Sequence, residues 1–320
     1  MKTPWKSILA ALIAALVLIG CNPSTPSESA SEATPAPPPD AVVFTDALGY
    51  EVELHSRDRV VSLYGSFAET WLLAGGTLVG TTSDAIEERD LELGDAAVVG
   101  TVKAPNLEAI IAAEPDFVIL AADIAGQTDL HQALADVGIP HAYYRTDTFN
   151  EYLAMLEQFC FLTGRDDLYQ INGLDVQAQI QQVLETVKGQ PQPTALLVRA
   201  YSSGAKAKGA DNLAGVILED LGADNLVSRY ESLLEDLSLE TIIAADPDFI
   251  FITTMGSSAE DAMAYMEQTF AQNPAWAGLS AVQNGRYLLL PRDLFHYKPN
   301  ARWGESYAYL ANILYPEAMD

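Results

Sequence analysis

A fifteen-residue segment occurs twice in this chain, 132 residues apart. Residues 106–120 read NLEAIIAAEPDFVIL and residues 238–252 read SLETIIAADPDFIFI, with nine of fifteen positions identical. Each copy starts with a residue that caps helices, Asn106 or Ser238, and continues through a helical apolar stripe and a Pro-Asp pair into a buried strand. Because solenoid repeats return every ~20–50 residues, a single repetition at this longer offset predicts two similar lobes instead.

Short apolar runs alternate with helical patterns in both halves of the chain. Strands are expected over residues 60–63, 78–82, 117–121 and 141–144, and again over 195–200, 249–253 and 286–290. Helices are expected over residues 66–74, 127–137, 212–221 and 259–270, with Ser66 as an N-cap and Glu69 completing a capping box. This alternation predicts an α/β fold of two Rossmann-like lobes, each with a mainly parallel sheet.

Between the two halves, residues 148–188 carry two helical patterns separated only by Gly164. The stretch from 166 to 188 is rich in Gln, Leu, Val and Ala and contains no proline, and Pro191 and Pro193 follow it. We therefore predict a single long connecting helix that joins the lobes as a stiff strut.

The N-terminus has the pattern of a targeting segment. Lys2 and Lys6 precede a twelve-residue apolar run over residues 8–19, which is too short to span a bilayer as a helix. The run ends Leu-Ile-Gly-Cys and resembles a bacterial lipoprotein lipobox, which implies cleavage before Cys21 and acylation of that cysteine. A plain secretory signal is the alternative. Residues 22–40 hold six prolines, four serines and no large apolar residue, and these features are typical of a tether.

The expected organisation follows from these patterns. It comprises a signal peptide (1–20), a lipidated cysteine with a Pro/Ser-rich tether (21–41), an N-terminal lobe (42–147), a helical connector (148–190) and a C-terminal lobe (191–320). An extended tether of this length reaches roughly 60 Å, so the folded part is expected near the cell membrane, facing outside the cytoplasm.

Composition argues against several classes of protein. The net charge is −27, from 44 acidic against 17 basic residues, and it opposes binding to nucleic acid. Two cysteines and four scattered histidines, with no His-x-x-x-His pair, predict neither a disulfide framework nor a dedicated metal site. No Gly-x-Ser-x-Gly elbow, Walker loop or Gly-x-Gly-x-x-Gly motif is present, so a surface α/β enzyme is the less favoured alternative and no cofactor is expected.

The repeat, the lipobox, the tether and the connector occur together with VVSLYGSFAETWLLAGG in the first lobe and AVQNGRYLLLP in the second. The set resembles one family, the substrate-binding lipoproteins of ABC importers for ferric siderophores, haem and cobalamin, over about residues 42–316. The resemblance implies a monomer that captures an iron complex between two lobes and delivers it to an ABC permease and its ATPase. It also implies little closure between the lobes, because the connecting helix is rigid.

The resemblance further implies that one glutamate on each lobe docks onto arginines of the permease. The matching residues are Glu108 and Glu240, each third in its copy of the repeat. Two carboxylates at pseudo-symmetric positions can engage a two-fold permease and steer the encounter. The simpler alternative is that each glutamate only stabilises a helix N-terminus, by about 0.3–1 kcal/mol.

Ligands of open α/β sheets bind beyond the carboxyl ends of the strands, and the loops expected there are rich in cations. Seven of the chain's 17 lysines and arginines fall on these loops, in company with tyrosines. Such a set suits an anionic ligand with flat or aromatic surface, although an ordinary surface ion pair is the alternative for any single cation. The expected ligand-binding residues are Tyr64, Lys103, Arg145, Arg199, Tyr201, Lys206, Lys208, Met255, His296, Tyr297, Lys298 and Arg302.

A ferric siderophore-like complex is the first choice of ligand, haem the second and a corrinoid the third. The chelator of a siderophore fills the coordination sphere of the iron, so the protein need not supply a metal ligand. For haem, the candidate axial ligands are Met255, His296 and Tyr297. Packing is the alternative role for Met255, and Lys103 occupies the corresponding place in the first lobe.

Several conspicuous residues are expected to take no part in binding. They are a buried free thiol, two packing tryptophans and three histidines without partners nearby in the sequence, namely Cys160, Trp71, Trp276, His55, His131 and His141.

Overall fold

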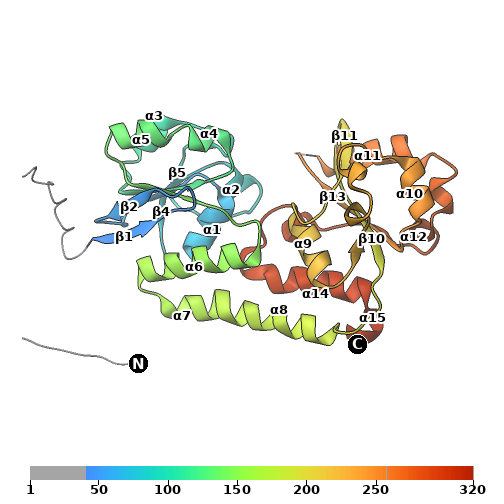
Figure 1. Ribbon diagram of the computed structural model, residues 1–320. Helices are drawn as coiled ribbons and strands as arrows, with labels where there is room; N and C mark the ends of the chain where they lie inside the picture. The colour runs from blue at the N-terminus through green and yellow to red at the C-terminus, as the bar shows by residue number, and fades with distance from the viewer. Residues whose placement is uncertain (1–40, 257, 320) are drawn as a thin grey trace, which may run out of the picture. The chain divides into compact units, whose positions relative to one another are not determined.

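Two five-stranded sheets, one from each half of the chain, organise the computed structural model, which describes residues 41–256 and 258–319 (Figure 1). The strands of the first sheet are β3 (Val60–Ser62), β4 (Leu78–Thr81), β5 (Ala97–Val98), β8 (Phe117–Ala121) and β9 (His141–Tyr144). Their order is β5–β4–β3–β8–β9, and every neighbouring pair is parallel. The helices of this lobe are α1 (Gly65–Leu73), α2 (Asp84–Glu87), α3 (Leu107–Ala112), α4 (Ala125–Thr128) and α5 (His131–Asp136).

Two antiparallel hairpins complete the N-terminal lobe. The first pairs β1 (Val42–Thr45) with β2 (Glu51–Leu54), and the second pairs β6 (Gly100–Thr101) with β7 (Ala104–Pro105). In place of the single helix predicted over residues 127–137, the structure has two separate helices, α4 and α5.

The second sheet has the strands β10 (Thr194–Tyr201), β11 (Gly204–Ala207), β12 (Asp224–Asn225), β13 (Phe249–Thr254) and β14 (Tyr287–Leu289). The order is β11–β10–β13–β14, with β12 also paired to β10, and only β11 runs antiparallel to its neighbour. The helices after β10 are α9 (Leu213–Asp220), α10 (Leu239–Ala245), α11 (Ala259–Met266), α12 (Ser280–Gln283), α13 (Arg292–Phe295), α14 (Trp303–Leu314) and α15 (Pro316–Met319). The predicted α/β fold with two mainly parallel sheets is confirmed.

Alternate residues of the central strands pack on opposite faces of each sheet. On β8, Phe117 and Ile119 join one large hydrophobic cluster, whereas Val118 joins a cluster confined to the N-terminal lobe. On β13, Phe251 belongs to the same large cluster and Ile252 to a cluster confined to the C-terminal lobe. Since side chains alternate along a strand, one face of each sheet packs on a core confined to its own lobe. The other face packs on a core that both lobes share.

Helices contribute to the core that both lobes share. The helix α6 (Phe149–Thr163) packs on the N-terminal lobe, where Phe159 makes edge-to-face contacts with Trp71 at 5.2 Å and Tyr144 at 5.0 Å between ring centroids. It ends at Gly164, whose φ of 70° is left-handed and ends the helix there.

A second, uninterrupted helical run then leads towards the C-terminal lobe. It consists of α7 (Asp166–Tyr169), a π-helical turn (Gln170–Leu174) and α8 (Asp175–Thr186), and α8 lies alongside α14 (Figure 1). This run is the predicted connecting helix, and α14 accompanies it as a second helix in the shared core. No helix within residues 41–256 and 258–319 has both the length and the apolar character that a membrane span requires.

Both copies of the repeated segment begin as predicted. The side chain of Asn106 accepts a hydrogen bond from the backbone N–H of Ala109 at 3.1 Å, and that of Ser238 accepts one from Thr241 at 3.3 Å. These bonds satisfy N–H groups that have no partner inside the helix, and they explain why α3 and α10 begin where they do.

The predicted capping box at the start of α1 is wrong. The helix begins at Gly65, and its first N–H donates to the carboxylate of Asp84 at 2.7 Å, so a side chain from α2 caps α1. A β-carbon at Gly65 would lie 2.8 Å from the backbone of Ala85, and this close approach excludes other residues there. Ser66 and Glu69 therefore lie inside the helix and bond elsewhere.

The residues expected to be structural are mostly so. Cys160 is a buried free thiol, and Trp71 and Trp276 are both buried in hydrophobic cores. His131 and His141, however, are partners of each other, with Nδ1 of His131 and Nε2 of His141 2.9 Å apart. The sequence pattern does not predict this contact, because it depends on how α5 packs near β9 in the folded chain.

We expect acid to destabilise the protein partly through His141. Burial and the neighbouring His131 lower the pKa of His141 below its ordinary value of 6.5. The unfolded chain therefore binds more protons than the folded protein at pH values below about 6.5, and acid favours unfolding. Urea midpoints at about pH 7.5 and about pH 5.5 should differ less for His141→Gln than for the wild type. The exposed His55→Gln is the control and should follow the wild type; equal falls in all three proteins would contradict the prediction.

Candidate functional site

Arg292, His296 and Tyr297 contact one another beyond the carboxyl ends of β13 and β14, and Arg199 of β10 lies near enough for its charge to act on His296. We call these four side chains the arginine cluster. The Arg292 guanidinium donates to the Tyr297 hydroxyl at 2.9 Å and lies 5.2 Å from the centroid of that ring. The rings of His296 and Tyr297 are 4.8 Å apart. Burial and the charges of Arg292 and Arg199 lower the pKa of His296 to about 4, so its imidazole is neutral at pH 7.

Arg199 occupies the face of the second sheet that builds the shared core. It follows Ala195 and Leu197 on that face, because residues two apart along a strand point the same way. The side chain is half-buried, and burial lowers its pKa without removing the charge. Within the described residues it makes neither a hydrogen bond nor an ion pair, so its donors are available to a ligand.

Three other predicted cations are already paired with acids. Arg302 donates to Asp293 and Glu305, at 2.7 Å in each case, and this pairing raises its pKa. Lys208 lies 2.6 Å from Asp211, and Lys298 lies 2.5 Å from Asp147. The strongly acidic composition makes such pairing common, and it weakens the case for these residues as direct ligand contacts.

The remaining predicted residues join the arginine cluster through no bond between described residues. Two of them lie in strands, although loops are predicted there: Tyr201 ends β10 and Lys206 belongs to β11. Lys103, Lys206 and Met255 are exposed, and Lys206 is the register partner of Arg199 on β11. Tyr201 is half-buried and covers Gly204.

Two residues of the N-terminal lobe have more defined surroundings. Tyr64 is half-buried between β3 and α1, and burial raises its pKa to about 12, so the phenol keeps its proton. Arg145 is exposed and lines a groove of about 270 Å³ between the start of the lobe and α6, with Ala47 and Gln158.

Arg292 was missed in the sequence, although it obeys the rule that selected the other residues. It follows β14 directly after Pro291, and its guanidinium lies 3.4 Å from the Thr254 hydroxyl at the end of β13.

Glu108 and Glu240 occupy equivalent places in the two lobes. Each is exposed and lies in the first turn of its helix, α3 or α10. Cys21, the predicted lipidation site, lies outside the described residues. Among the residues described, no group of three or more His, Cys, Asp or Glu side chains is placed to hold a metal ion.

Comparison with known proteins places this chain in a family. Residues 60–294 match the family model described as periplasmic binding protein. The chain belongs to this family. Its members bind solutes for ABC transporters, so this chain is a solute-binding protein and not an enzyme. The expected resemblance to binding proteins for ferric siderophores and haem is thereby confirmed.

Several relatives show the range of ligands in the family. The Fe(3+)-citrate-binding protein YfmC of Bacillus subtilis is 24% identical over 291 residues, which cover 88% of this chain and 87% of the relative. The crystal structure of Staphylococcus aureus SirA complexed with staphyloferrin B is 21% identical, covers 86% of this chain and 98% of its own, and has a TM-score of 0.64. A periplasmic heme binding protein from Pseudomonas aeruginosa is 23% identical, covers 81% and 93%, and has a TM-score of 0.65. At these identities the two structures support the fold of this chain, but they do not show which ligand it binds.

Proposed function

We propose that this periplasmic binding protein captures an anionic ferric complex between its two lobes and delivers it to an ABC permease. The arginine cluster carries the proposal, because two guanidinium groups gather there in a chain of net charge −27. Arginine binds carboxylates with two parallel hydrogen bonds, and aromatic rings beside it supply a flat apolar contact. The name of the relative YfmC favours a carboxylate chelate such as ferric citrate within this class.

The path to the permease is part of the same proposal. Acylation of Cys21 would anchor the protein as a monomer on the outer side of the cell membrane, and residues 22–40 would act as the tether. Glu108 and Glu240 would dock onto basic residues of the permease, one from each lobe. Their support is the same exposed, first-turn position in both halves of the chain.

Haem is the second candidate ligand. Met255 is 44% exposed directly after β13, and the neutral imidazole of His296 is the form that can donate electrons to iron. A Met or His ligand would bind the iron, while the two arginines would meet the propionates.

A fluorescence titration of the purified protein tests the proposal. The ligands are ferric citrate, a ferric hydroxamate siderophore, a ferric catecholate siderophore, haem and cobinamide, each beside its metal-free form. We expect a ferric complex to quench the tryptophan fluorescence saturably at submicromolar concentration; Trp303 lies six residues after Tyr297 of the arginine cluster. A Soret shift with haem would favour the second candidate. Absence of any saturable change in a protein that is folded by circular dichroism would reject the proposed function.

A further inference from the structure

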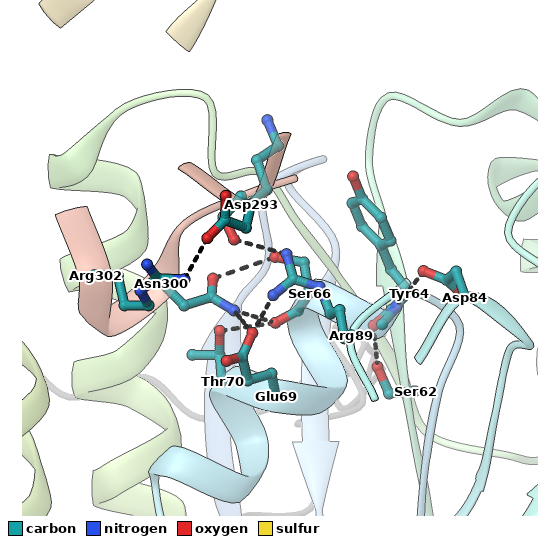
Figure 2. A network of polar contacts seen from close by, with 12 residues as sticks. Ser62, Tyr64, Ser66, Glu69, Thr70, Asp84, Arg89, Asp293, Asn300 and Arg302 are labelled. Atoms are coloured by element: carbon teal, nitrogen blue, oxygen red, sulfur yellow. Dashed lines mark hydrogen bonds and ion pairs between the residues drawn. The ribbon is translucent and has the colours of Figure 1, made fainter. Parts of the chain in front are cut away.

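The segment over residues 291–300 carries three of the four residues of the arginine cluster and is attached to both lobes. At its start, the Arg292 guanidinium approaches the Thr254 hydroxyl of β13 at 3.4 Å, within the C-terminal lobe. At its end, Asn300 reaches α1 of the N-terminal lobe (Figure 2). His296 and Tyr297 lie between these two attachments.

Asn300 is completely buried, and both the nitrogen and the oxygen of its side-chain amide are hydrogen-bonded. Its Nδ2 donates to the Ser66 carbonyl at 3.0 Å and to the Glu69 carboxylate at 2.7 Å, while its Oδ1 accepts from the Ser66 hydroxyl at 3.2 Å. The backbone of Asn300 has a φ of 51°, a left-handed conformation that asparagine tolerates better than most residues. The chain is therefore held at one definite place on α1.

Arg89 makes the second attachment. One arm of its guanidinium forms an ion pair with Glu69 (Figure 2). The other arm donates to the backbone carbonyl of Lys298 at 2.6 Å. The Arg89 side chain is only 10% exposed, so these bonds are formed largely away from water. The Lys298 ammonium in turn pairs with Asp147, and the N-terminal lobe thus holds this residue by both its backbone and its side chain.

We propose that Arg89 is a positioning residue for ligand capture, which fixes the segment from His296 to Lys298 against the N-terminal lobe through Glu69 and Asn300. The expected effect on ligand binding rests on the proposed function, whereas the contacts of Arg89 and Asn300 do not. A planar guanidinium can bond a carboxylate and a carbonyl at once, whereas an ammonium is a point charge without that fork. Fixing the segment in advance spares the ligand the entropy of ordering it, and this strengthens binding.

The conservative variant Arg89→Lys separates positioning from stability. Lysine keeps a positive charge beside Glu69, so the urea midpoint should stay near that of the wild type. Loss of the bond to the Lys298 carbonyl should weaken ferric citrate binding about tenfold, within the range of coupling between separate sites. In the ligand-free protein, the backbone amides of residues 296–298 should exchange hydrogen faster, while those of β10 and β13 should not change.

Arg229→Lys is the matched control, because Arg229 also pairs with a carboxylate, that of Asp224, and makes no bond to the N-terminal lobe among the described residues. It should alter neither affinity nor exchange. Unchanged affinity and exchange in Arg89→Lys would overturn the inference, as would lower stability with unchanged affinity under conditions where the variant is fully folded. If the wild type binds none of the ferric complexes, the proposed function fails, and the exchange measurement still decides whether Arg89 positions the segment.

Discussion

Uptake of the ferric ligand by cells should be abolished when Glu108 and Glu240 are both replaced by arginine, while the purified variant binds that ligand as well as the wild type. Both carboxylates are exposed in the first turn of a helix, and neither belongs to the arginine cluster. Reversal would place arginine against the proposed basic surface of the permease, and juxtaposed like charges cost several kcal/mol. Transport of radioactive iron and a ligand titration measure the two effects separately.

The control for this experiment is a second pair of exposed glutamates in first turns, Glu260 of α11 and Glu317 of α15. Charge reversal there costs a similar ~0.3–1 kcal/mol per helix N-terminus and changes the net charge equally. Uptake should persist in this control. If uptake also persists in the Glu108→Arg, Glu240→Arg variant with ligand affinity intact, the docking proposal is wrong and each glutamate only stabilises its helix.

The second large effect is expected at Arg199. Arg199→Gln should weaken binding of ferric citrate about 100-fold, because loss of a desolvated charge partner costs about 3 kcal/mol. The same change should not lower the urea midpoint, since Arg199 has no partner among the described residues and a half-buried charge without one does not favour folding.

Arg286→Gln is the matched control, since it removes the same charge from the same lobe. Arg286 lies over the ring of Phe249, at the opposite end of the strands from the arginine cluster, and its loss should leave the affinity unchanged. An Arg199→Gln variant with wild-type affinity would show that the ligand binds elsewhere on the protein.

Local sequence patterns determined the parts of the fold that depend on near neighbours in the chain. The caps at Asn106 and Ser238, the alternating apolar strands and the duplicated segment are read over a few residues, and the structure confirms them. The rule that ligands bind beyond the carboxyl ends of strands likewise led to Arg199, His296 and Tyr297, which the structure brings together.

Interactions between distant parts of the chain could not be predicted in the same way. Asp84 caps α1 in place of Ser66. Acidic side chains form ion pairs with Lys208, Lys298 and Arg302. A sequence shows that cations are scarce, but only the packed chain shows which of them acids neutralise, because many acids compete for each cation.

What the sequence by itself determined is therefore the class of protein, its two α/β lobes and the edge of the sheets where a ligand should bind. What only the tertiary structure decided is which cations stay unpaired there and how Asn300 and Arg89 hold the segment between the lobes. The physical reason is the sequence distance over which the interactions act. Capping and strand alternation act over a few residues, whereas the bonds of Asn300 to Ser66 and Glu69 join positions more than 230 residues apart.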